Sequence, residues 1–178
     1  IMIDRTSVNN VIADNLSEQN NQDGLTFFES ENNVTWGNKF LNNKKNGIRI
    51  RNSWNIKLDN DIIEDNGGTS IEVYTADISG QQTRDFELDP YTAKASAIIN
   101  GASISTSGAA VFKIKDAELM GITNTQVRAA THLFPLSLQY DEKILRENIS
   151  KPDIMVNVRS PYFPDVQPPT ERKHYVEE

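Results

Sequence analysis

Cysteine is absent from this 178-residue chain, so neither a disulfide framework nor a thiolate metal site can form. Histidine is scarce, and only His132 and His174 are available for acid–base chemistry. No apolar run reaches 18 residues, so we expect no membrane span. Hydrophobic residues make up only 37% of the chain, and its mean hydropathy is −0.54. A chain this polar either contains disordered segments or forms an elongated solenoid with a large surface per residue.

Positive charge is also in deficit. The formal net charge is −7 and the isoelectric point is about 4.9, which argues against general nucleic-acid binding. Against this background, residues 42–60 carry Arg49, Arg51 and Lys57 among alternating apolar residues. Because contact is decided by the nearby field more than by the net charge, such a cationic stripe can still bind a polyanion.

The arginines belong to a frame that recurs about every 23 residues. Four stretches share the frame: VIADNLSEQNNQDGL, VTWGNKFLNNKKNGI, IKLDNDIIEDNGGTSI and SAIINGASISTSGAAV. Each has an early asparagine and, five residues later, a small polar residue; the pairs are Asn15 and Asn20, Asn38 and Asn43, Asn60 and Asp65, and Asn100 and Ser105. A glycine or another small residue then precedes a short predicted strand, and these strands begin at Leu25, Ile48, Ile71 and Val111. Ile1 fits as the start of an earlier strand of the same kind.

A repeat of this length is too short for helical hairpins, and it lacks the dense leucine frame of leucine-rich repeats. The sequence therefore predicts an all-β fold, a right-handed parallel β-helix of about five coils. We expect stacked asparagines to satisfy backbone groups at the turns. We also expect stacked apolar residues to form one continuous core, because no coil buries its own face alone. The two expected core columns are Ile1, Leu25, Ile48 and Ile71, and Val11, Val34 and Ile56.

The regular repeat predicts three regions. Residues 1–135 form the coils, with an insertion loop at 76–95 that we expect to lie on one face, either as a lid over the binding surface or packed against the barrel. Residues 136–160 form a C-terminal cap, made of a short helix with Asp141 as its N-cap and a last strand in KPDIMVNV. Residues 161–178 are rich in proline and charge, which indicates a flexible tail.

Strand alternation orients the arginines. If Ile48 and Ile50 point into the coil, Arg49 and Arg51 point outward. The equivalent outward positions on the other coils are Met2, Asp4, Thr26, Phe28, Glu72 and Tyr74. A flat sheet with arginine, aspartate, threonine and aromatic side chains suits an extended, anionic, hydroxyl-rich polymer. The alternative is an ordinary solvated strand face.

Several longer stretches are more distinctive than the repeat itself: IMIDR, DGLTFFES followed by WGN, NGIRIRNSWNIKL and RDFELDPYTAKAS. They resemble the C-terminal half of the periplasmic mannuronan C-5 epimerases of alginate biosynthesis, and IMIDR is similar to that family's Gly-Ile-x-Leu-Asp-Arg strand. The resemblance covers residues 1 to about 105. It implies a right-handed β-helix that converts D-mannuronate to L-guluronate within the polymer, in the periplasm of a Gram-negative bacterium.

The resemblance also implies a division of roles. The family removes the C5 proton with a His and Asp in an Asp-Pro-His-Asp motif, which this sequence lacks. No catalytic residue can therefore be assigned here, and we expect the chain to be a C-terminal part of an epimerase, or the product of an incomplete gene, that is inactive alone. The residues that carry over as substrate-binding candidates are Asp4, Arg5, Arg49 and Arg51. The outward strand positions add Tyr74, which stacks either on a sugar or on another aromatic ring. The loop residues Arg84, Asp85, Asp89 and Pro90 also match the family.

Two other functions remain open: a non-catalytic polysaccharide-binding or spike-type β-helix, and an alginate-lyase-like β-helix. A lyase needs a Lys or Arg base beside a carboxylate-bound cation, and no acidic cluster of that kind is evident. We expect no metal and no cofactor, and we expect His132 to be structural. The expected partner is an anionic polysaccharide, polymannuronate or alginate, together with other alginate secretion proteins, and no nucleic acid.

Overall fold

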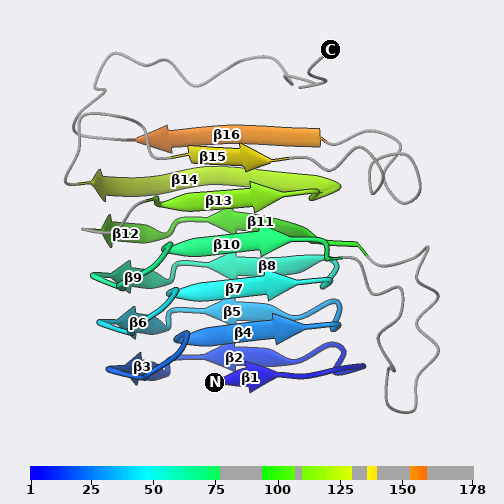
Figure 1. Cartoon of the computed structure of the whole chain (residues 1–178), viewed down its shortest axis with the longest axis horizontal. Coiled ribbons are helices and arrows are strands. Elements are labelled where there is room, and N and C mark those ends of the chain that lie inside the picture. Colours follow the sequence, from blue (N-terminus) through cyan, green and yellow to red (C-terminus); the bar gives the residue numbers. More distant parts are fainter. Residues whose placement is uncertain (77–93, 107–109, 130–135, 140–152, 160–178) are drawn as a thin grey trace.

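The computed structural model describes residues 1–76, 94–106, 110–129, 136–139 and 153–159, the last two ranges by their backbone alone. The described elements are all strands, stacked into about five coils (Figure 1). Three strands form each of the first three coils. The first coil contains β1 Met2–Ile3, β2 Val11–Ala13 and β3 Leu16–Glu18, and the second contains β4 Leu25–Phe28, β5 Val34–Trp36 and β6 Lys39–Leu41. The third coil contains β7 Ile48–Arg51, β8 Ile56–Asp59 and β9 Ile62–Glu64. The later strands are β10 Ile71–Tyr74, β11 Ser96–Asn100, β12 Ser103–Thr106, β13 Phe112–Lys115, β14 Leu119–Ala129, β15 Leu136–Gln139 and β16 Asp153–Arg159.

Every strand pairs in parallel with its equivalents in the coils before and after it. One six-stranded sheet has the order β1-β4-β7-β10-β13-β15. A ten-stranded sheet contains the other two strands of each coil, joined through the long strand β14, which also pairs with β16. Figure 1 shows the six-stranded sheet in front, with the coils rising in sequence order from β1 to β15. The predicted all-β parallel β-helix is therefore confirmed.

The core lies between the sheets and is built from columns of aligned apolar side chains. On the six-stranded sheet, Ile48 pairs with Leu25 on one side and Ile71 on the other, and all three are fully buried. The column continues to Phe112, one residue after the predicted start at Val111. A second inward column contains Phe27, Ile50, Val73 and Ile114.

The predicted core column Val11, Val34 and Ile56 is wrong by one residue for Val11 and Val34, whereas Ile56 is fully buried as expected. Val11 is 70% exposed, and it aligns with Val34 and then with Lys57 on the outer face of the ten-stranded sheet. The inward column is Ile12, Thr35 and Leu58. Because strand side chains alternate between faces, a slip of one residue reverses the face. Val11 and Ile12 are both apolar, so the sequence pattern did not distinguish them.

Asparagine side chains bind neighbouring coils together in ladders at the turns. In one ladder, Asn43 Oδ1 accepts hydrogen bonds from the backbone N–H and from Nδ2 of Asn20. Asn43 Nδ2 donates to Asn66 Oδ1 and to the carbonyl of Ser17. Each buried amide thus satisfies backbone groups of the coil below, which would otherwise be left unpaired. Other ladders contain Asn10 and Asn33, and Asn15, Asn38 and Asp61.

The sequence alignment placed Asn60 and Asp65 in these ladders, and this is also wrong by one residue. The ladder members are Asp61 and Asn66. Asn60 and Asp65 instead adopt positive φ angles of 54° and 51°. Asparagine and aspartate tolerate this left-handed conformation better than other residues with side chains, so they suit the bend before each ladder position.

Several domain predictions fall partly outside the described residues. A strand is present at 153–159 within the expected cap, and β15 adds a further strand to the six-stranded sheet. The predicted capping helix with Asp141, most of the 76–95 insertion, and the tail at 161–178 lie outside the described residues. The three-region division therefore stays a prediction.

Asp61 is the one acidic member of the ladders described above. It is fully buried, and it accepts hydrogen bonds from Thr35 Oγ1, from Asn38 Nδ2 and from the backbone N–H of Asn38. Burial raises the pKa of Asp61 above its ordinary value of 3.8, although these hydrogen bonds oppose the shift. Since the native state holds the proton more tightly, stability is greatest below the unfolded pKa and is lost as the pH rises through the folded pKa.

We therefore expect Asp61→Asn to raise the melting temperature at neutral pH. The new amide keeps the acceptor for Asn38 and removes the buried charge, so its advantage should shrink as the pH falls toward 4. The matched control is Asn66→Asp, which introduces a carboxylate where Asn66 Nδ2 now donates to the carbonyl of Phe40 and should lower the melting temperature. A lower melting temperature for Asp61→Asn at neutral pH would contradict this account.

Candidate functional site

The outer face of the six-stranded sheet carries two columns of side chains, which lie at alternate strand positions. The first column contains Met2, Thr26, Arg49, Glu72 and Lys113. The second column contains Phe28, Arg51, Tyr74 and Lys115. Inward and outward residues alternate along β7 as the sequence predicts, so both arginines point outward and are half-buried.

Ion pairs within the protein neutralise the first column. Arg49 Nη2 lies 2.8 Å from Asp23 Oδ2, and the Asp23 side chain is almost completely buried. Asp23 also accepts hydrogen bonds from Thr26 Oγ1 and from the backbone N–H of Asn46. In the same column, Lys113 Nζ lies 2.9 Å from Glu72 Oε1. These cations are already bound to carboxylates, so the first column is chiefly a structural network.

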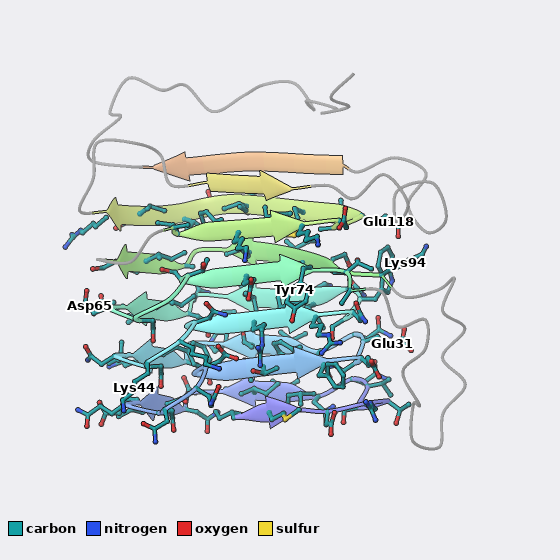
Figure 2. The ribbon with its side chains drawn as sticks, in the orientation of Figure 1. Glu31, Lys44, Asp65, Tyr74, Lys94 and Glu118 are labelled. Carbon is teal, nitrogen blue, oxygen red and sulfur yellow. The ribbon has the colours of Figure 1, made fainter. Side chains whose placement is uncertain are left out.

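The second column is different, because its cations have no carboxylate partner among the described side chains. The guanidinium of Arg51 lies over the ring of Phe28, 4.8 Å from the ring centre. No hydrogen bond or ion pair is observed for the side chains of Tyr74 and Lys115 within the described residues. Figure 2 shows Tyr74 in front of β10, away from Lys44 and Asp65 at the opposite edge of the coils. This column can therefore accept an anionic ligand without breaking an existing ion pair.

Arg5 joins the same cluster from the first coil. Its Nε lies 2.8 Å from Oε2 of the buried Glu29, and its guanidinium lies 5.0 Å from the centre of the Phe28 ring. Asp4 is exposed, and its Oδ1 accepts a hydrogen bond from the backbone N–H of Arg5. Arg5 and Arg51 thus meet at Phe28, whereas the local role of the Asp4 carboxylate is to close a turn.

The five predicted binding residues all lie on or beside this face, but they are not equivalent. Arg51 and Tyr74 are neighbours in the second column, Arg49 and Arg5 are paired with buried acids, and Asp4 lies at the first coil. Sequence reasoning missed the acids Asp23 and Glu29 and the lysines Lys113 and Lys115. The signal for the lysines was present, because FKIK has the same alternation as IRIR.

A shallow pocket of about 430 Å³ opens beside the first column near the start of the chain. Its lining consists of Ile1, Met2, Asn20, Asn21, Gln22, Asp23, Thr26 and Arg49. Within the described ranges, no group of three His, Cys, Asp or Glu side chains is arranged to hold a metal ion. Nor does any helix in that part of the chain have the length and apolarity needed to cross a membrane. His132, His174 and the loop residues Arg84, Asp85, Asp89 and Pro90 lie outside the described residues.

Comparisons with known proteins agree with this fold. The family described as "Right handed beta helix region" matches residues 1–84, which agrees with the predicted handedness. A mannuronan C5-epimerase of Pseudomonas putida is 41% identical over 114 residues, which are 64% of this chain and 22% of the relative. The mannuronan C5-epimerase AlgG of Azotobacter vinelandii is 36% identical over 113 residues, 64% of this chain and 21% of the relative. The chain is similar to part of the mannuronan C5-epimerases.

Solved structures support the relationship to these epimerases. The crystal structure of the periplasmic alginate epimerase AlgG aligns with a TM-score of 0.66 and 36% sequence identity, covering 71% of this chain and 30% of that one. The A-module of the Azotobacter vinelandii epimerase AlgE6 aligns with a TM-score of 0.57 at 14% identity, which shows the shared fold alone. This chain spans about a fifth of the length of the curated epimerases to which it is similar.

The different environments of the two arginines lead to a stability prediction. Arg49→Ala leaves the buried Asp23 carboxylate without its cation, so we expect the free energy of unfolding to fall by about 1–2 kcal/mol. Arg51→Ala removes a stacking contact with Phe28 and should cost less than about 1 kcal/mol. Urea denaturation of the two variants measures the difference.

The matched control is Asp23→Asn combined with Arg49→Ala. Because the two side chains form one interaction, the double variant should lose less stability than the sum of the single variants. Additive losses, or a larger loss for Arg51→Ala than for Arg49→Ala, would show that the Arg49–Asp23 pair does not stabilise the fold.

Proposed function

We propose that this chain is part of a mannuronan C5-epimerase and that the second column binds the polyuronate substrate. The observation that carries the proposal is the column itself, in which Arg51 and Lys115 have no carboxylate partner among the described side chains and Tyr74 lies between them. Guanidinium and ammonium groups bind carboxylates, and an aromatic ring packs against the apolar face of a pyranose. The relationship to the epimerases supplies the substrate class, a polymer of D-mannuronate.

The chemistry of the proposed reaction explains why cations are needed. The C5 hydrogen of a uronate lies next to the carboxylate, whose negative charge opposes formation of a carbanion. A bound cation neutralises that carboxylate, a base then removes the C5 proton, and a donor returns a proton to the opposite face. The second column would bind and orient the carboxylates of sugars along the polymer. We assign no residue of this chain as the base, because it has no Asp-Pro-His-Asp motif.

One alternative is a binding module without catalysis, favoured by the lack of a histidine among the described residues. A lyase-like activity has less support, because the described residues hold no acidic cluster for the cation that such a mechanism needs. The proposed location is the periplasm, which is where the structurally similar AlgG acts by its description. We also propose that the protein contacts other alginate secretion proteins there.

The binding part of the proposal is tested with polymannuronate itself. We expect the chain to bind polymannuronate in calorimetry and to show no binding of neutral mannan, which has the same sugar backbone without carboxylates. Affinity should fall as salt is raised from about 0.05 to 0.5 M, because exposed ionic contacts are screened. Equal binding of the neutral and anionic polymers would contradict the proposed role of the cations.

The chemical part is tested by proton exchange in heavy water. If the base is not supplied by this chain, incubation with polymannuronate should leave C5 undeuterated by NMR, even where binding is saturated. A longer epimerase such as the Pseudomonas putida relative serves as the positive control for exchange. Deuterium at C5 with this chain alone would show that it contains a base, and His132→Ala would be the first variant to examine.

A further inference from the structure

The second column carries two cations that lie two coils apart. Arg51 on β7 pairs in register with Tyr74 on β10, which pairs in register with Lys115 on β13. Adjacent strands lie roughly 4.8 Å apart, so the backbones of Arg51 and Lys115 are separated by roughly 9–10 Å, with Tyr74 midway. This order of cation, aromatic ring and cation runs parallel to the axis of the β-helix.

The charge environment singles out these two cations. On the same strands, Arg49 is bound to Asp23 and Lys113 is bound to Glu72. Arg51 and Lys115 have no such partner among the described side chains. Arg51 is also held in place by Phe28, which limits the entropy lost when its guanidinium binds a ligand. Among the described residues, the face therefore offers two available cations that lie two coils apart.

A flat, β-linked polyuronate has the matching repeat. Successive sugars in such a ribbon are related by about a half-turn, so carboxylates on one edge belong to every second sugar. One sugar also advances along the ribbon by a distance similar to one strand spacing. A ribbon that lies parallel to the helix axis therefore brings every second carboxylate to every second coil.

We propose that Arg51 and Lys115 bind the carboxylates of two alternate sugars of one polyuronate chain, and that Tyr74 packs against the sugar between them. This inference rests on the proposed function and adds the direction and register of the polymer. The competing direction runs along β7, where Arg49 and Arg51 are about 7 Å apart on one strand. That direction is disfavoured because a ligand would have to displace Asp23 from Arg49.

The test uses mannuronate oligomers of defined length with the 178-residue chain. A trimer spans both cations, so Arg51→Ala and Lys115→Ala should each weaken its binding about tenfold, and Tyr74→Ala should weaken it as well. A dimer reaches only one cation at a time, so either single substitution should weaken its binding no more than about twofold. NMR titration measures both affinities.

The matched control is Lys57→Ala, which removes the same charge from the outer face of the ten-stranded sheet and should leave trimer binding unchanged. Tyr74→Phe should retain the affinity that Tyr74→Ala loses, because it keeps the ring. If the substitutions weaken binding of the dimer and of the trimer equally, or if only Arg49→Ala weakens binding, the proposed two-coil register is wrong. The proposal that the chain binds polyuronate is not contradicted by either result. If the parent chain does not bind polymannuronate at all, the proposed function itself fails.

Discussion

The structure depends on the register between successive coils, which buried amide side chains enforce. Asn43 illustrates the constraint, since its side chain bonds to Asn20 below, to Asn66 above and to the backbone of Ser17. A slip of one residue between coils would leave these groups unpaired in the interior, where each loss costs about 1–3 kcal/mol. The same register that stacks the amides also stacks the outward side chains into columns, so the proposed binding face is a direct consequence of the core.

Within that face, electrostatics divides structural cations from available ones. Asp23 and Glu29 are buried acids that hold Arg49 and Arg5 beside the sheet. A buried carboxylate without a cation is costly, so these pairs keep their partners. Arg51 rests on an aromatic ring, which positions it, and no carboxylate among the described side chains compensates its charge. This explains how a chain with a net charge of −7 can still offer positive charge to an anionic polymer.

The sequence was sufficient to predict the solenoid, its period and the outward direction of Arg49 and Arg51, because polar and apolar residues alternate cleanly in IRIR. It was insufficient where neighbours have the same character: Val11 beside Ile12 differ in face, and Asn60 beside Asp61 differ in role. The Arg49–Asp23 ion pair could not be predicted either, because residues 26 positions apart come into contact only once the coils are stacked. Lys115 was missed because the sequence alignment started the strand after the insertion at Val111, whereas the position equivalent to Ile71 is Phe112, and an offset of one residue reverses the face.

The central claim is that sugars lie on the second column, across the coils. Intermolecular nuclear Overhauser effects in a complex with trimannuronate would test it most directly, with the Tyr74 ring as the reporter. The account predicts contacts from the Tyr74 ring protons to the middle sugar, with the two end sugars near Arg51 and Lys115. Contacts from the sugars to Trp36 or Ile98, which are exposed on the ten-stranded sheet, with none to Tyr74, would contradict it.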